Sequence, residues 1–195
     1  MKKIVVTFVL AALTIFSIST QSKANLITNG GFETGNFSGW TLGGNTGFTL
    51  VVSGSFDGMS PHSGTYFAAL GAVGSNDILM QSTPISTING QSYTLTWWLA
   101  SDGDTPSDFS VSFDGTQLFA ATNLHQMGWT EYSYTVIGTG SDNISINSRN
   151  DPGYLGLDDV SLTPNAAPVP EPASLILLGT GILGLAGARR WRHHK

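Results

Sequence analysis

Residues 25–164 repeat one pattern, in which short segments of alternating apolar and polar side chains are separated by clusters of Gly, Asn, Asp and Ser. A period of two places alternate side chains on opposite faces of a β-strand. No stretch of this region shows a helical period. The pattern predicts an all-β fold, an antiparallel β-sandwich of the jelly-roll type. We expect strands at 26–32, 48–53, 65–70, 77–82, 92–100, 108–113, 116–121, 129–137, 143–147 and 156–163.

The alternation also assigns faces, most clearly in 92–100. Leu95, Trp97 and Leu99 share one face with Tyr93 and are expected in the core, while Trp98 points the other way among threonines. A flat, outward-facing indole can stack on the apolar face of a sugar ring. Trp98 is therefore a candidate glycan-binding residue, unless a loop or a neighbouring strand covers it. Further core positions are expected at Phe109, Val111, Phe113, Tyr132, Tyr134, Val136, Ile144 and Ile146, with Trp40 and Trp129 as core plugs.

The last expected strand contains a chemical anomaly. Asp158 alternates in phase with Val160 and Leu162, which should face the core. A buried carboxylate is costly unless it is paired or binds a metal ion. A hard cation such as Ca²⁺ would solve this, because such sites collect carboxylate and carbonyl oxygens. The alternatives are that Asp158 pairs with Arg149 or accepts backbone N–H groups.

The charge of residues 25–168 excludes several kinds of partner. Arg149 is the only Lys or Arg in 25–168, against twelve Asp and Glu, which gives a net charge of −11. Nucleic acid and anionic lipid are therefore unsuitable partners. The chain has no cysteine, so neither disulfides nor thiol chemistry are available.

Catalytic patterns are weak in this region. A glycoside hydrolase needs two carboxylates facing each other across a cleft, and the only glutamates in 25–168 are Glu33 and Glu131. The only histidines there are His62 and His125, too few for a convincing catalytic triad. We therefore expect a protein that is not an enzyme, with a glycoside hydrolase as a less favoured alternative.

The C-terminal residues read as three successive parts. A Pro-rich spacer at 165–172 contains Val169, Pro170, Glu171 and Pro172, and it is followed by an uncharged apolar run at 173–188 and a basic tail at 189–195. The apolar run is short for a bilayer, which needs about 20 helical residues. Its basic flank favours the cytoplasmic side of a membrane. The alternative is a buried core helix that ends in a basic tail.

This order of parts resembles the PEP-CTERM sorting signal of Gram-negative bacterial proteins, whose tails an exosortase processes. The resemblance implies cleavage near the Val169–Pro172 motif, a transient stay of the helix in the inner membrane, and export to the cell surface or to an exopolysaccharide matrix. The N-terminus agrees with export. Residues 1–24 combine a positive start, an apolar run and a small-x-small site, which predicts a signal peptide cleaved between Ala24 and Asn25 rather than a permanent anchor.

A second resemblance spans most of 25–163. Asn29-Gly30-Gly31-Phe32-Glu33, Gly39-Trp40, His62-Ser63-Gly64-Thr65-Tyr66 and Leu157-Asp158-Asp159-Val160-Ser161-Leu162 are similar to segments of galactose-binding-domain-like jelly rolls, which include carbohydrate-binding modules. In those families the first and last strands lie side by side and share a structural calcium ion. The resemblance implies that Glu33 and Asp158 bind the ion through their side chains, together with backbone oxygens of the loop before Thr65. Asp57, in the same loop region, is a possible extra ligand.

Two functions from different classes follow. The domain at 25–164 is either a non-catalytic carbohydrate-binding module that holds exopolysaccharide, or a structural matrix or surface protein that binds no glycan specifically. A second exposed aromatic residue close to Trp98 would favour the first, and a smooth Ser and Thr surface would favour the second.

Overall fold

The computed structural model describes residues 24–165. All but one residue each of the predicted signal peptide (1–24) and spacer (165–172), and the whole of the apolar run (173–188) and basic tail (189–195), lie outside the described residues. Within 24–165 no helix is long and apolar enough to cross a membrane. The strands are β1 (Trp40–Gly44), β2 (Thr49–Ser53), β3 (Tyr66–Leu70), β4 (Asp77–Gln81), β5 (Ser92–Ser101), β6 (Ser107–Phe113), β7 (Thr116–Thr122), β8 (Met127–Ile137), β9 (Ile144–Asn150) and β10 (Leu155–Pro164).

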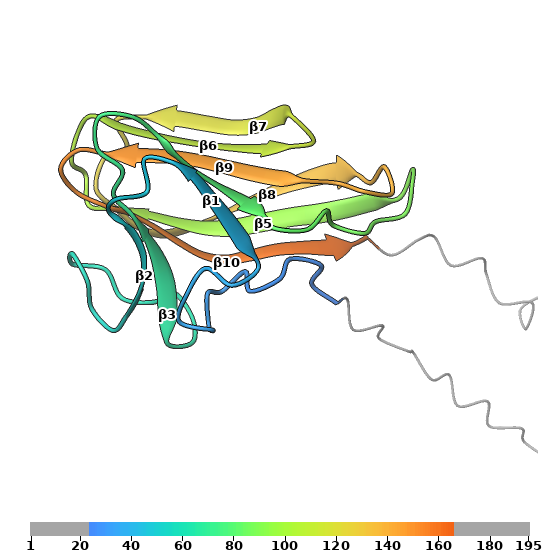
Figure 1. Ribbon diagram of the computed structural model, residues 1–195, viewed down its shortest axis with the longest axis horizontal. Coiled ribbons are helices and arrows are strands. Elements are labelled where there is room, and N and C mark those ends of the chain that lie inside the picture. The colour runs from blue at the N-terminus through green and yellow to red at the C-terminus, as the bar shows by residue number, and fades with distance from the viewer. Residues whose placement is uncertain (1–23, 166–195) are drawn as a thin grey trace, which may run out of the picture.

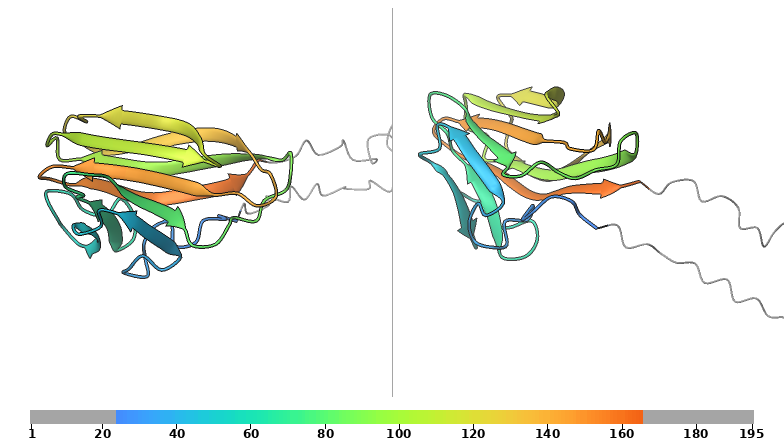
Figure 2. Two further views of the ribbon diagram at one scale, coloured as in Figure 1. Left: turned by 45° about the horizontal axis from the view of Figure 1, so that its top comes forward. Right: turned by 45° about the vertical axis from the view of Figure 1, so that its right-hand side comes forward.

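These strands form two five-stranded antiparallel sheets that pack face to face (Figure 1). The first sheet has the order β1-β4-β9-β6-β7, and the second has the order β2-β3-β10-β5-β8. Figure 2 shows the two layers from further sides, with β7 and β8 at the same border of the sandwich. The predicted all-β jelly-roll sandwich is confirmed.

The core between the sheets contains the side chains that the alternation assigned to it. Leu95, Trp97 and Leu99 of β5 are fully buried. Phe109, Val111, Phe113, Ile144 and Ile146 of the first sheet are also buried. Tyr132 and Tyr134 are only half-buried, because β8 is the edge strand of its sheet, and both rings stack on Trp97 with centroids 5.7 and 5.4 Å away.

The predicted strand at 26–32 is wrong, because this segment is a series of turns. Asn29 and Phe32 have positive φ angles of 52° and 57°, which a strand does not accommodate. The segment still runs beside β10 (Figure 1), since the Leu26 N–H donates to the Leu162 carbonyl (2.9 Å) and the Val160 N–H donates to the Gly30 carbonyl (3.0 Å). The two ends of the domain therefore lie side by side, as the resemblance implied.

Strand β1 had no counterpart among the predicted strands, because its sequence Trp-Thr-Leu-Gly-Gly is poor in β-branched residues. It forms by pairing with β4, with Trp40 opposite Gln81. Trp40 is buried and stacks on Phe32 at 5.8 Å, so its predicted place in the core is correct.

Candidate functional site

The outer face of the second sheet is covered by the loop 54–65, which joins β2 to β3. Ala68 and Leu70 of β3 point into the main core, so Phe67 and Ala69 point outward. A second apolar cluster forms there. Its buried members are Met59, Phe67, Ala69 and Ala100, and Val52, Phe56, Trp129 and Tyr154 pack against them. This cluster fixes the loop to the sheet.

A tight turn shapes the tip of this loop. Phe56 and Met59 exchange two backbone hydrogen bonds of 2.8 and 2.9 Å, and Asp57 and Gly58 between them have φ angles of 48° and 74°. Positive φ at both central residues is the signature of a type I′ hairpin turn, for which Asp-Gly is a preferred pair. The turn presents the Asp57 carboxylate at the surface.

A cleft of about 510 Å³ lies between this loop tip, the end of β5 and the start of β8. Its walls are residues 57–61, Ala100, Ser101, Asp102 and residues 126–129. Ligand sites in proteins are typically roughly 300–1,000 Å³ in volume. The cleft is thus large enough for a few sugar units, and it combines apolar walls with carboxylate, hydroxyl and amide groups.

Trp129 is the aromatic residue of the cleft wall, and its indole is held on several sides. Its Nε1–H donates to the Ser60 carbonyl (2.8 Å), and Phe67 meets the ring edge-on at 5.7 Å. A Cβ on Gly156 would lie 2.8 Å from the indole, so only glycine there lets the ring approach the sheet. Trp129 is half-buried: it lines the cleft and packs against the second apolar cluster, so the prediction that it plugs the core between the sheets is wrong.

Two carboxylates stand close together at the cleft. The pKa of Asp57 is raised mainly by partial burial, and to a smaller extent by a hydrogen bond with Asp102 and by repulsion from its charge. Partial burial opposes ionisation of Asp102, but hydrogen bonds from the backbone N–H groups of Asp104 and Tyr154 lower its pKa overall. Asp102 is therefore the ionised partner, fixed in place, and Asp57 is the more readily protonated one.

Asp158 lies in β10 of the second sheet, away from the cleft. Its side chain points to the outer face of that sheet, not to the core face that the alternation predicted. A bulge in β10 places Asp158 opposite Trp98 and Ser161 opposite Thr96, with Asp159 at a φ of 47° between them. The extra residue breaks the alternation. Val160 and Leu162 face the core, whereas Asp158 faces the outer side beneath the loop 54–65.

Asp158 is nevertheless fully buried, as predicted. Its carboxylate accepts the backbone N–H groups of His62 (3.0 Å) and Ser63 (3.3 Å), so the predicted alternative of backbone donors is the one observed. The pKa of Asp158 is raised to about 7, mainly by burial and to a smaller extent by repulsion from Asp159. Arg149 does not reach it and instead pairs with Asp151 at 2.6 Å.

Glu33 approaches the same part of the loop. Its carboxylate accepts the backbone N–H groups of Thr65 and Tyr66, each at 3.0 Å. A Cβ on Gly31 would lie 3.7 Å from Asp158 Oδ1 and 3.8 Å from Glu33 Cγ, so the two predicted ligands border the same glycine.

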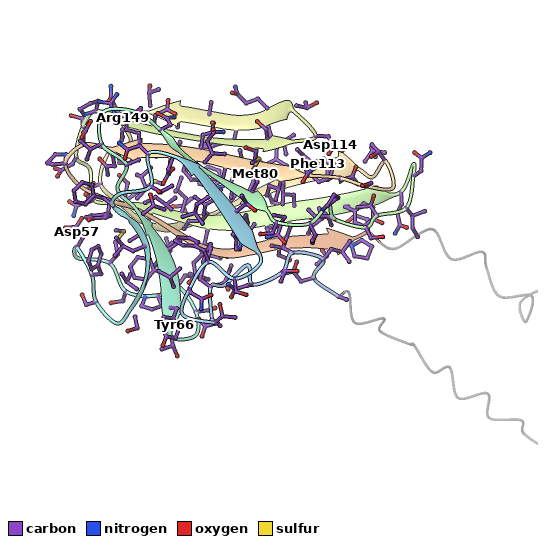
Figure 3. The ribbon with its side chains drawn as sticks, viewed as in Figure 1. Asp57, Tyr66, Met80, Phe113, Asp114 and Arg149 are labelled. Carbon is purple, nitrogen blue, oxygen red and sulfur yellow. The ribbon has the colours of Figure 1, made fainter. Side chains whose placement is uncertain are left out.

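The third predicted ligand lies elsewhere. Asp57 stands beside Asp102 at the cleft, and Figure 3 shows it well apart from Tyr66, whose N–H binds Glu33. Among residues 24–165, no group of three or more His, Cys, Asp or Glu side chains is arranged to hold a metal ion.

Trp98 points outward, as the alternation predicted, but its indole is partly covered. The His62 ring stacks on it with centroids 3.7 Å apart and an angle of 17° between planes. His62 is itself fixed by Asp159, whose Oδ2 lies 2.7 Å from Nδ1. Trp129 is close by, with its ring 6.0 Å from His62. A second outward-facing aromatic residue therefore lies near Trp98, and this half-buried Trp129 is the one that lines the cleft.

The alternation of side chains in the sequence already indicated that Trp129 lies outside the core between the sheets. Trp129 alternates with Glu131, Ser133 and Thr135, and these side chains lie on the face opposite to Tyr132, Tyr134 and Val136. The alternation of β8 thus placed it outside the core. The preceding glycine and the size of the indole suggested a plug instead.

Comparison with known proteins gives two family matches. The profile of a carbohydrate-binding domain family matches residues 24–146, and that of the PEP-CTERM protein-sorting motif matches residues 168–190. No curated protein matches the chain.

Several solved structures share the fold. TmCBM61, solved with β-1,4-galactotriose, is 22% identical and aligns over 73% of this chain and 99% of its own, with a TM-score of 0.54. The CBM22-1–GH10 modules of a Clostridium thermocellum xylanase, solved with xylohexaose, are 18% identical over 74% of this chain and 29% of their own, with a TM-score of 0.52. An adhesin domain of Lys-gingipain from Porphyromonas gingivalis is 15% identical over 70% and 96%, with a TM-score of 0.52.

Proposed function

Because the chain belongs to the carbohydrate-binding domain family whose profile spans residues 24–146, we propose that its sandwich binds polysaccharide at the cleft beside Trp129. The family supplies the class of ligand. The observation that supports the place is an indole held rigidly in the wall of an open cleft of about 510 Å³.

The chemistry of the cleft suits a sugar. An indole offers a flat apolar face to the C–H groups of a pyranose ring, while Ser60, Asp102 and Gln126 supply polar groups for the hydroxyls. The Ser60 hydrogen bond and the Phe67 contact hold the indole before any ligand arrives. A pre-oriented ring loses little conformational entropy on binding, which favours affinity.

Trp98 remains the second candidate for the stacking residue. It lies next to this region, and His62 covers its ring. A sugar could stack on Trp98 only if His62 moved, which would also break the contact of His62 with Asp159. This cost favours Trp129 over Trp98.

The test is binding of the full-length chain to a panel of polysaccharides, with Trp129→Ala and Trp98→Ala as matched variants. The chain is kept in a detergent without a sugar headgroup, so that the detergent does not compete. Truncating a central aromatic residue typically costs about 2 kcal/mol or more, roughly thirtyfold in Kd. We expect that loss for Trp129→Ala and a small effect for Trp98→Ala.

The opposite ranking of the two variants would place the site at Trp98. No binding to any polysaccharide by a chain with a cooperative unfolding transition would favour the alternative, a structural surface protein without specific glycan binding. Family and sorting signal both indicate a non-catalytic binding protein. Release of reducing sugar from a bound polysaccharide would contradict that role and support a glycoside hydrolase.

The sorting motif at 168–190 indicates export to a surface or extracellular location. We propose more specifically that an exosortase processes the tail near Val169, Pro170, Glu171 and Pro172, and that the domain then resides in an exopolysaccharide matrix or on the cell surface. Mass spectrometry of the exported protein tests this. A C-terminal peptide that still contains Arg189–Lys195 would contradict processing.

We also propose that Glu33 and Asp158 hold a structural Ca²⁺ ion together with backbone oxygens. Two observations support it: Asp158 is fully buried without a cationic partner among residues 24–165, and the carboxylates of Glu33 and Asp158 both accept backbone N–H groups from the stretch 62–66. Asp57 is left out, since it lies beside Asp102. The ion would tie the N-terminal segment to β10 and offset the buried charge.

A further inference from the structure

We propose that the cleft beside Trp129 prefers glycans with free amino groups, such as glucosamine units, over neutral and acidic glycans. This proposal rests on the binding function proposed above and specifies the ligand class of the same site. It is based on the cleft itself and on the balance of charged, donor and acceptor groups around it.

The cleft walls carry negative charge and no positive charge. Asp57 and Asp102 both line the cleft, and no Lys, Arg or His does. Within the described chain Arg149 is the only Lys or Arg, and Asp151 already occupies it at 2.6 Å. An acidic glycan that entered the cleft would meet two carboxylates and no counter-charge, which opposes binding.

The two carboxylates also influence each other's ionisation. Both line the same cleft, and partial burial is the main cause of the raised pKa of Asp57, with a smaller contribution from Asp102. Two like charges in contact are relieved by a proton or by a cation between them. An ammonium group on a sugar carries the positive charge that this pair lacks.

Hydrogen-bond donors hold Asp102 from behind the cleft wall. Asn150 is fully buried and donates its Nδ2 hydrogen to Asp102 (2.9 Å). Its own Oδ1 has no hydrogen-bond partner among residues 24–165. Asp102 also accepts the Asp104 N–H at 2.8 Å. These donors orient Asp102 as an ionised acceptor at the cleft wall.

Trp129 adds the element that makes this a sugar site rather than an isolated pair of acids. It lines the same cleft as Asp57 and Asp102. A glucosamine unit stacked on the indole could direct its amine towards the carboxylates. The ammonium group would also gain a cation–π attraction to the face of the indole.

The test compares two ligands with the same backbone, the hexamer of β-1,4-linked glucosamine and its fully N-acetylated counterpart, with polygalacturonate as the acidic member. Binding to the full-length chain is measured by calorimetry at low and at high salt. We expect the glucosamine hexamer to bind more tightly than the N-acetylated hexamer, the difference to shrink at high salt, and polygalacturonate not to bind.

Asp57→Asn is the decisive variant, because asparagine also accepts positive φ and forms the same type of turn with Gly58. Asp114→Asn is the matched control, since Asp114-Gly115 forms an equivalent turn at the opposite end of the sandwich (Figure 3). We expect Asp57→Asn to weaken glucosamine-hexamer binding roughly three- to fivefold, as for a partly exposed ion pair. N-acetylated-hexamer binding and the Asp114→Asn protein should be unchanged.

Equal affinity for the two hexamers, or a preference unaffected by Asp57→Asn, would overturn this inference while leaving glycan binding at Trp129 intact. Absence of binding to every glycan would overturn it together with the proposed function. The two failures are therefore distinguishable in one experiment.

Discussion

The burial of Asp158 makes a specific prediction about pH and calcium. Its pKa rises from 3.8 to about 7 because of burial and the neighbouring Asp159. At 1.36 kcal/mol per pKa unit, this corresponds to roughly 4 kcal/mol of folding free energy. The folded protein holds the proton more tightly than the unfolded chain. The associated stability is therefore complete below about pH 4 and is lost as the pH rises to about 7.

The assay is urea unfolding at pH 5 and pH 7 in EDTA. The Asp158 carboxylate alone should lower the free energy of unfolding by roughly 2 kcal/mol between these two values. Asp158→Asn should remove most of this loss, because the amide cannot ionise and its oxygen can still accept the His62 N–H. Added Ca²⁺ should also remove it in the parent protein, because a bound cation stabilises the ionised carboxylate.

Three results would refute this reasoning. A pH dependence that is the same in Asp158→Asn as in the parent would show that the buried charge is not its cause. Stability at pH 7 that does not respond to either EDTA or Ca²⁺ would refute the calcium site, and an equal response to Mg²⁺ would refute its selectivity for Ca²⁺. Burial also raises the pKa of Asp77, so Asp77 changes stability with pH in the same direction. Because Asp77 is present in both proteins, its effect cancels in the comparison.

Two further predictions concern the residues around the cleft. Gly156→Ala should destabilise the fold by about 1–3 kcal/mol through overpacking, and it should weaken glycan binding because its Cβ would displace Trp129. Gly43→Ala is the control, since its Cβ would meet only Ile78, at 4.0 Å. Equal urea midpoints for the two variants would contradict this prediction. His62→Ala should uncover the Trp98 indole and increase its quenching by acrylamide, measured against a His62→Ala/Trp98→Phe protein, and unchanged quenching would show that His62 does not shield the ring.

The alternation of side chains was sufficient to predict most of the fold. It reflects a local property, the opposite direction of successive side chains, so it correctly assigned Leu95, Trp97 and Leu99 to the core. The Asp114-Gly115 turn is equally local, because an Asp-Gly pair favours a type I′ hairpin turn and its φ angles of 47° and 74° are both positive. Strand β1 was not predicted, since its Gly-rich sequence becomes a strand only through its partner β4.

The functional site was predicted less well because it depends on contacts between distant segments. The bulge at Asp159 reversed the expected face of Asp158, and no residue pattern indicates where a strand gains an extra residue. The loop 54–65 covers the outer face of the second sheet, which turned Trp98 from an open platform into the partner of His62. The same loop builds the cleft around Trp129, so the cleft itself could not be predicted from alternation.

The most direct test of the binding site is an NMR titration that follows the indole N–H signals of the ¹⁵N-labelled full-length chain as glucosamine hexamer is added. Trp129→Phe and Trp98→Phe proteins assign the two signals. We expect the Trp129 signal to shift in a saturable manner, while those of Trp40 and Trp97, both buried, stay in place. A saturable shift of the Trp98 signal with Trp129 unchanged would contradict a binding site at the cleft.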